Sequence, residues 1–138
     1  MTPDQTPATP ESPDHDEHDE HDEMHDDMDE CIEACLQAHV VCTMTAQYCL
    51  AQGGEHAAVD HVGLMLDCAE ICQTSANFML RGSHQHTETC ALCADICDLC
   101  AESCESMAGD DDLMRRCAQA CRRCAESCRK MAGTKTHA

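Results

Sequence analysis

Fifteen cysteines dominate the chemistry available to this chain, and their spacing is regular. The stretch CALCADICDLCAESC, residues 90–104, repeats cysteine at alternating intervals of three and four residues. On an α-helix this rhythm keeps side chains on one face, because residues three and four apart lie one above the other. Thiolate sulfur is a soft ligand that selects Cu(I), zinc or iron–sulfur clusters. The spacing therefore predicts a row of metal ligands along one helix face.

Cysteines with the same rhythm occur in four successive segments of the chain. The last contains CAQACRRCAESC, residues 117–128, and the first two contain CIEAC, residues 31–35, and CAEIC, residues 68–72. Placed at 100° per residue, the cysteines of each segment share the face that a helical bundle turns toward its core. The candidate metal ligands are therefore Cys31, Cys35, Cys42, Cys49, Cys68, Cys72, Cys90, Cys93, Cys97, Cys100, Cys104, Cys117, Cys121, Cys124 and Cys128.

Two explanations other than metal binding compete for these rows. Cysteine can pack as a small hydrophobic residue, but Leu or Ile would bury far more apolar area at each position. Disulfides between facing helices are disfavoured, because the helix axes lie about 8–10 Å apart, whereas the Cα atoms of a disulfide are at most roughly 7 Å apart. Metal binding explains the complete set best, and both alternatives stay open.

Charge and spacing favour Cu(I) among the soft metals. Cysteines four residues apart, such as Cys93 and Cys97, have Cβ atoms about 5–6 Å apart. One ion can therefore join successive turns through an S–metal–S unit of roughly 4.6 Å. Buried thiolates must be neutralised nearly one for one, which a monovalent ion bridging two thiolates achieves and zinc with four thiolates does not. The sequence also has no C-x2-C-x2-C-x3-C-P run of the kind that holds ferredoxin clusters. The predicted cargo is multiple Cu(I) ions per chain.

The composition divides the chain into an acidic tail and a folded domain. Residues 1–30 hold 13 of the 27 acids, all four prolines and three HDE repeats, with no Lys or Arg. This composition predicts a disordered, acidic, His-rich tail over residues 1–25. The domain that follows, residues 26–138, has few large apolar residues, because Leu, Ile, Val and Phe number only 16 in the whole chain. Sulfur must therefore fill much of its core.

Helical periodicity predicts the elements that position the cysteines. Four segments are expected, at roughly 26–52, 56–81, 86–108 and 111–132, separated by Gly53-Gly54, Gly82-Ser83 and Gly109. Asp110 to Asp112 suit the start of the last helix as a cap. Because short connections force antiparallel neighbours, the predicted fold is all-α, an up-down-up-down four-helix bundle with a cysteine-lined core.

In these motifs the chain resembles the bacterial copper storage proteins, a cysteine-rich four-helix-bundle family. The four quoted motifs carry this resemblance, which covers about residues 26–132. It implies a bundle whose lumen is lined by cysteines that bind many Cu(I) ions, assembled as a homotetramer. It also implies a role in storing or buffering copper, in the cytosol for members without a signal sequence.

The resemblance further implies His and Met ligands near one open end of the lumen. The end that we favour includes His61 and Met65 as predicted ligands, with Met107 and Met114 nearby. The opposite end offers Met24, Met28, Met79, Met131, His84 and His86. We expect His39, by contrast, to lie on the flank of the first helix.

The predicted function is non-catalytic storage and buffering of Cu(I) in copper homeostasis or detoxification. The alternatives are a Zn/Cd-sequestering buffer and a copper metallochaperone that use the same thiols. An enzyme would need one activated thiolate or an open redox metal, and no cysteine stands apart from the rows. No stretch of the sequence resembles a signal peptide or membrane span, so a cytoplasmic protein is expected.

The expected partners are copper ions, a copper chaperone or efflux system, and further copies of the chain. A net charge of −19 argues against nucleic acid and anionic membranes. An apolar patch of Val59, Val62 and Leu66 suggests self-association. Acidic side chains of the third predicted helix and basic ones of the fourth could form ion pairs or remain solvated.

Overall fold

A computed structural model describes residues 19–133 of the chain, with side chains described from residue 26. Four long helices account for most of it, namely α1 (Asp19–Gln52), α2 (Val59–Leu80), α3 (His86–Ala108) and α4 (Asp112–Gly133). A short 3-10 helix, η2 (Gly54–Ala57), lies in the first connection. Of the predicted tail over residues 1–25, residues 1–18 lie outside the described residues.

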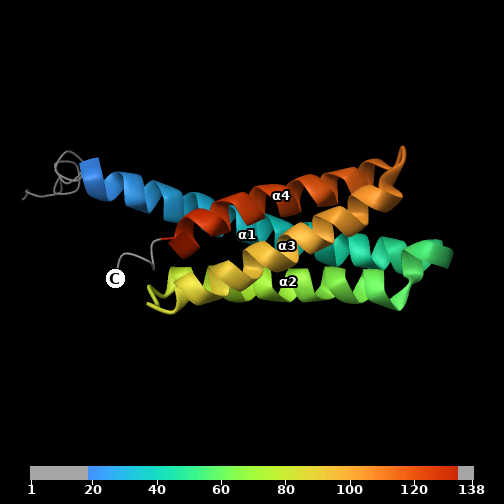
Figure 1. The fold of residues 1–138 in the computed structure, drawn as a ribbon, viewed down its shortest axis with the longest axis horizontal. Helices are drawn as coiled ribbons and strands as arrows, with labels where there is room; N and C mark the ends of the chain where they lie inside the picture. The colour runs from blue at the N-terminus through green and yellow to red at the C-terminus, as the bar shows by residue number, and fades with distance from the viewer. Residues whose placement is uncertain (1–18, 134–138) are drawn as a thin grey trace, which may run out of the picture.

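The helices form an antiparallel bundle in which each has two neighbours (Figure 1). Helix α1 packs against α2 and α4, and α3 packs against the same two helices, so α1 lies diagonally opposite α3. The α1–α2 and α3–α4 connections meet at one end of the bundle, while the α2–α3 connection and the end of α4 lie at the other. This arrangement confirms the predicted four-helix bundle.

Helix α1 begins at Asp19, earlier than the predicted start at residue 26. The sequence of its first turns is rich in Asp and Glu. Acidic residues stabilise the N-terminus of a helix because they interact favourably with the helix dipole. No proline follows Pro13 to interrupt the helix. The added turns project beyond the α2–α3 connection (Figure 1). Residues 19–25 are therefore helical, although composition alone predicted disorder for them.

Local sequence signals end and begin the helices close to the predicted positions. At the end of α2, the Gly82 N–H donates to the carbonyl of Met79 and the Ser83 N–H to that of Phe78. This is a Schellman motif, in which Gly82 adopts a φ of 72° that favours glycine. At the start of α4, Oδ1 of Asp111 accepts hydrogen bonds from the N–H groups of Leu113 and Met114. Asp111 is thus the cap of α4.

The core of the bundle consists almost entirely of Cys, Ala and Met side chains. Val62 is 7% exposed and belongs to this core, so the prediction that it lies on an outer apolar patch is wrong. The period-3.6 pattern brings Val62 close to the inward face of α2, beside the buried Met65. Val59 and Leu66 do remain exposed, at 85% and 49%.

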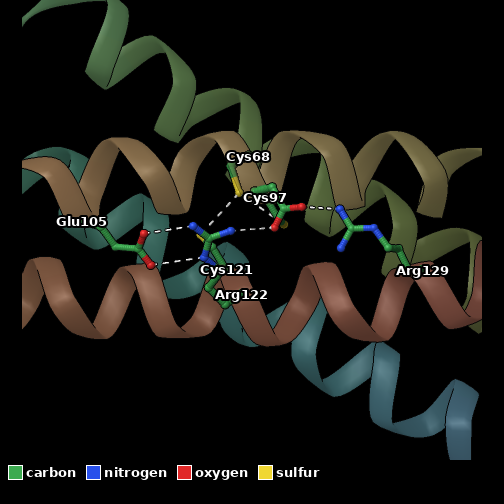
Figure 2. A network of polar contacts seen from close by, with 7 residues as sticks. Cys68, Cys97, Glu105, Cys121, Arg122 and Arg129 are labelled. Carbon is green, nitrogen blue, oxygen red and sulfur yellow. Dashed lines mark hydrogen bonds and ion pairs between the residues drawn. The ribbon is translucent and has the colours of Figure 1, made fainter.

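Ion pairs between α3 and α4 cover one seam of the bundle (Figure 2). The guanidinium of Arg122 lies 3.1 Å from a carboxylate oxygen of Asp98 and 2.9 Å from one of Glu105. Arg129 also pairs with Asp98. Acidic residues of α3 thus form ion pairs with basic residues of α4 at these four positions. The sequence alone did not decide between ion pairing and solvation for these side chains.

Candidate metal centre

All fifteen cysteines are completely buried, with 0% of each side chain exposed, and all are free thiols. They line a lumen that all four helices share. Contacts cross both diagonals of the bundle, since Cys42 of α1 lies 4.0 Å from Cys100 of α3, and Cys68 of α2 lies 3.7 Å from Cys121 of α4, measured between Sγ atoms. The structure therefore brings every predicted thiol into one interior.

The sulfur atoms are in near contact along most of the lumen. The Sγ atom of Cys72 lies 3.5 Å from that of Cys97, 3.7 Å from that of Cys93 and 3.8 Å from that of Cys124. Cys68, Cys97 and Cys121 meet directly inside the ion-paired seam (Figure 2). Each central thiol thus has several sulfur neighbours, as bridging ligands require.

Four groups of thiols converge closely enough to hold a single metal ion. Within each group the Sγ atoms all lie within 4.8 Å of one another. The groups are Cys31, Cys90 and Cys128; Cys35, Cys93, Cys124 and Cys128; Cys72, Cys93, Cys97 and Cys124; and Cys42, Cys100, Cys117 and Cys121. Cys93, Cys124 and Cys128 each belong to two groups, so three of the four groups share ligands. Cys68 links the fourth group to them, because its Sγ atom lies 3.7 Å from that of Cys121 and 3.6 Å from that of Cys97.

Sulfur separations along single helices define the coordination that the lattice favours. The Sγ–Sγ distance is 3.8 Å for Cys93 and Cys97 and 3.9 Å for Cys124 and Cys128. These separations are shorter than the roughly 4.6 Å of a linear S–metal–S unit, and with metal–sulfur bonds of about 2.3 Å they correspond to bond angles of roughly 110–120°. The rows therefore suit bent or trigonal coordination with little rearrangement, rather than the linear unit that sequence reasoning assumed.

Burial and contacts between thiols raise the pKa of several lumen thiols when no metal is bound. At one end, desolvation raises the pKa of the Cys49 thiol to about 11. In the middle of the lumen, contacts with neighbouring thiols and burial raise the pKa values of Cys42 and Cys97. A metal that binds these residues must displace their protons, so binding and proton release are coupled.

The charges around the lumen favour a monovalent ion. Among the described residues, the buried set includes no Lys or Arg, and His61 is its one basic side chain. The arginines of α4 lie on the outer surface, with Arg122 43% exposed in its side chain. A zinc ion with four thiolates would leave two negative charges in a dry interior without a cation to offset them. A lattice of bridging thiolates and Cu(I) is neutral.

At the end formed by the α1–α2 and α3–α4 connections, imidazole and thioether groups join the thiols. Nε2 of His61 lies 3.4 Å from Sγ of Cys49, which in turn lies 3.5 Å from Sδ of Met114. Nδ1 of His61 is 2.7 Å from Oγ of Ser103. Met65 of α2 is fully buried in the core of the bundle. The sequence analysis did not identify Ser103, because nothing in the sequence distinguishes a serine next to a row of cysteines as part of a metal site.

The opposite end offers sulfur without imidazole. Sγ of Cys90 lies 3.9 Å from Sδ of Met79, and Met131 is 4% exposed. His84 is exposed, while Nδ1 of His86 contacts the Ser83 carbonyl at 2.9 Å. The side chain of Met24 is outside the described residues. Histidine therefore contacts the buried sulfur at the His61 end, and the two described histidines at the other end stay outside it.

His39 lies on the flank of the bundle, where sequence reasoning placed it. Its Nδ1 atom is 2.8 Å from the carbonyl oxygen of Ala69 on α2. With Thr43 and Leu66 it lines an outer groove between α1 and α2 of about 460 Å³. His39 therefore serves the α1–α2 contact and is not part of the metal centre.

Comparison with known proteins agrees with this geometry. A family model described as copper storage protein matches residues 24–133. Among solved structures, the Nmul_A1745 protein of Nitrosospira multiformis is 49% identical with a TM-score of 0.74, and the match covers 80% of this chain and 98% of that one.

Two further solved structures are of copper storage proteins with copper bound. The Cu(I)-bound copper storage protein BsCsp3 of Bacillus subtilis is 38% identical, with a TM-score of 0.71 and coverage of 77% of this chain and 98% of that one. A cytosolic copper storage protein from Streptomyces lividans, loaded with five coppers, is 28% identical with a TM-score of 0.73, over 78% of this chain and 93% of that one. This chain belongs to the copper storage protein family.

Proposed function

We propose that this protein stores Cu(I) by binding many ions to the fifteen thiols of its lumen. The observation that carries the proposal is the close contact between fully buried sulfurs, in which three of the four thiol groups share ligands. Shared thiolates allow a monovalent ion to be bound at close to one per cysteine while the interior stays neutral. The capacity then scales with the number of cysteines, as storage requires.

The role is storage and buffering rather than catalysis. A catalytic thiolate works from a partly exposed, electropositive position where it can meet a substrate. Here every thiol is buried, and the sulfur lattice binds Cu(I) in place of an open reactive site. The same burial argues against a metallochaperone, because rapid transfer of one ion needs an accessible pair of ligands.

A buffer for divalent zinc or cadmium is the remaining alternative, and the four-thiol groups are large enough for a tetrahedral ion. Several such ions would accumulate two negative charges each in a lumen whose described buried residues include no Lys or Arg. The electrostatic cost grows with every ion added. Charge balance therefore favours Cu(I), and it favours it most strongly at high loading.

Copper enters and leaves the lumen at the His61 end. The end is marked by an imidazole in contact with the last thiol of α1, and by the fully buried Met65 and Met114. Neutral nitrogen and thioether ligands bind Cu(I) without adding charge, so they suit an ion that arrives before the lattice is filled. The opposite end lacks a described imidazole within contact of its thiols.

The protein acts in the cytoplasm as a homotetramer and exchanges copper with a chaperone or efflux system. Support for self-association comes from exposed apolar side chains on the outer face of α1 and α2, including Val40, Met44 and Leu66. No helix among the described residues has the length and apolar character needed to cross a membrane. The Streptomyces lividans relative is itself a cytosolic protein.

Copper loading under anaerobic conditions tests the storage proposal. The reduced protein is incubated with excess Cu(I), separated by gel filtration from unbound metal, and assayed for copper and for mass by light scattering. We expect a tetramer that retains close to one copper ion per cysteine. Retention of only one or two ions per chain would contradict storage and favour a chaperone.

A further inference from the structure

The imidazole of His61 is held between a hydroxyl group and a thiol. Its Nδ1 atom is 2.7 Å from Oγ of Ser103 on α3, and its Nε2 atom is 3.4 Å from Sγ of Cys49 on α1. The side chain is only 3% exposed, so packing fixes the direction of both ring nitrogens. Ser103 is half-buried and lies one residue before Cys104 of the thiol row.

The two contacts have different consequences for a metal. In a neutral imidazole one ring nitrogen carries the proton and the other has a free lone pair. A serine hydroxyl can accept the Nδ1 proton, and Nε2 then presents its lone pair to Cys49. If instead Nε2 carried the proton, no nitrogen ligand would face the lumen. Because a hydroxyl can also donate to Nδ1, the direction of the Ser103 contact decides whether His61 can bind copper through Nε2.

A third ligand completes this site. Sγ of Cys49 also lies 3.5 Å from Sδ of Met114, so a thiol, a thioether and an imidazole nitrogen meet at one point. Only one of these three ligands must lose a proton when an ion binds. One thiolate with one Cu(I) is neutral, and the other two ligands add no charge. The site can therefore accept a single ion before neighbouring ions are present, whereas a single Cu(I) bound by two thiolates of a four-thiol group would carry one excess negative charge.

We propose that Ser103 is a positioning residue that holds His61 as the Nδ1-protonated tautomer, and so prepares Cys49, His61 and Met114 to receive the first Cu(I) ion. The inference rests on the proposed storage function. On binding, the Cys49 S–H bond gives up its proton to solvent, and Cu(I) forms bonds to Sγ, Nε2 and Sδ without a change of oxidation state. Other buried ligands are oriented in the same way by a hydrogen bond on the far side of the ring.

The experiment compares Ser103→Ala with the matched control Ser106→Ala and the conservative variant Ser103→Thr. Ser106 is exposed, lies on the same helix and donates its hydroxyl proton to the Ser103 carbonyl. Two quantities are measured for the full chain. The tautomer of His61 is read from the ¹⁵N shifts of histidine-labelled apo protein, assigned with His61→Gln. The rate of copper uptake is measured by stopped flow from a Cu(I)–chelator complex, and the final copper content is measured alongside it.

The wild type should show the Nδ1-protonated tautomer of His61. Ser103→Ala should shift the population toward the Nε2-protonated form and slow the first phase of copper uptake about tenfold, in the range seen for such supporting hydrogen bonds. Ser103→Thr and Ser106→Ala should behave like the wild type, and all variants should reach the same final copper content.

Three results would overturn the inference: an Nε2-protonated wild type, uptake by Ser103→Ala at the wild-type rate, or slower uptake with an unchanged tautomer. In each case a high final copper content would leave the storage function standing. Low copper content in the wild type itself would instead contradict storage, so the two failures are distinguishable.

Discussion

Sγ of Cys72 on α2 and Sγ of Cys97 on α3 lie 3.5 Å apart in the middle of the bundle. The distance is well beyond a disulfide bond of about 2.05 Å, and with metal–sulfur bonds of about 2.3 Å it corresponds to two ligands of one ion at an angle of roughly 100°. Both thiols also contact Cys93, so the pair belongs to a larger shared cluster. This relationship makes the lattice, rather than the individual CxxC unit, the functional element.

Removal of one central thiol should lower the copper capacity by a small and defined amount. In Cys97→Ala we expect the loss of about one ion per chain, because buried thiolates and monovalent ions must balance nearly one for one. Copper content after gel filtration measures the change, with Ser106→Ala as the control at full capacity. A fall to a few ions would show that the lumen fills as one indivisible cluster, and an unchanged capacity would show that Cys97 is not a ligand.

The stability of the apo protein should fall at high pH. Because burial raises the pKa of the Cys49 thiol to about 11, above the roughly 8.5 of an unfolded thiol, this group favours the folded state fully below the unfolded value. That contribution is lost as the pH rises from about 8.5 toward 11.

Denaturant midpoints under reducing conditions measure this effect, and Cys49→Ala isolates the share of one residue. Between these pH values the free energy of unfolding of the variant should fall less steeply with pH than that of the wild type. The difference between the two slopes should correspond to at most about one bound proton. Identical slopes in the two proteins would show that folding does not raise the pKa of Cys49.

Replacement of Ser75 by alanine should stabilise the apo protein. The Oγ atom of Ser75 is buried on the lumen side of α2 with no hydrogen-bond partner among the described residues, and the residue is 0% exposed. An unsatisfied buried hydroxyl costs about 1–3 kcal/mol, and alanine also favours the helix. In Ser75→Ala we expect a gain on the order of 1 kcal/mol in the free energy of unfolding, measured in denaturant.

Ser127→Ala is the matched control for that measurement. Ser127 is 6% exposed on α4, and its hydroxyl interacts with the thiol of Cys31, whose pKa it lowers. Its removal should therefore lower the stability or leave it unchanged. Equal stabilisation by both variants would show that helix propensity, rather than the missing partner, explains the gain at Ser75.

Loss of the ion pairs on the α3–α4 seam should have a small effect on stability and none on copper capacity. In Arg122→Gln the two contacts to Asp98 and Glu105 are removed, and exposed pairs contribute about 0.2–1 kcal/mol each. Added salt should shrink the difference from the wild type, because screening weakens surface pairs. A loss of copper capacity in this variant would contradict the separation between the outer seam and the lumen.

The bundle and its thiol-lined interior could be predicted because a single physical signal sets both. A row of small side chains at helical spacing has to face inward, and glycines at 53–54, 82 and 109 separate the helices. Membership of the copper storage protein family, which the motifs at residues 90–104 and 117–128 indicated, is confirmed.

Features that depend on contacts between distant residues could not be predicted. Ser103 and His61 are far apart in sequence, and their hydrogen bond exists only because α2 and α3 pack side by side. Composition placed residues 19–25 in a disordered tail, whereas acidic first turns extend α1 to Asp19. The inward position of Val62 likewise follows from how α2 is rotated in the bundle, which periodicity defines only approximately.

Competition between Cu(I) and Zn(II) for the reduced protein tests the central claim most directly. The protein is titrated anaerobically with each metal in the presence of a competing chelator, and then with both together. The charge balance of the lumen predicts tight Cu(I) binding that saturates near the fifteen cysteines of the chain and displaces zinc. Saturation at a few Cu(I) ions, or preferential retention of zinc, would contradict it.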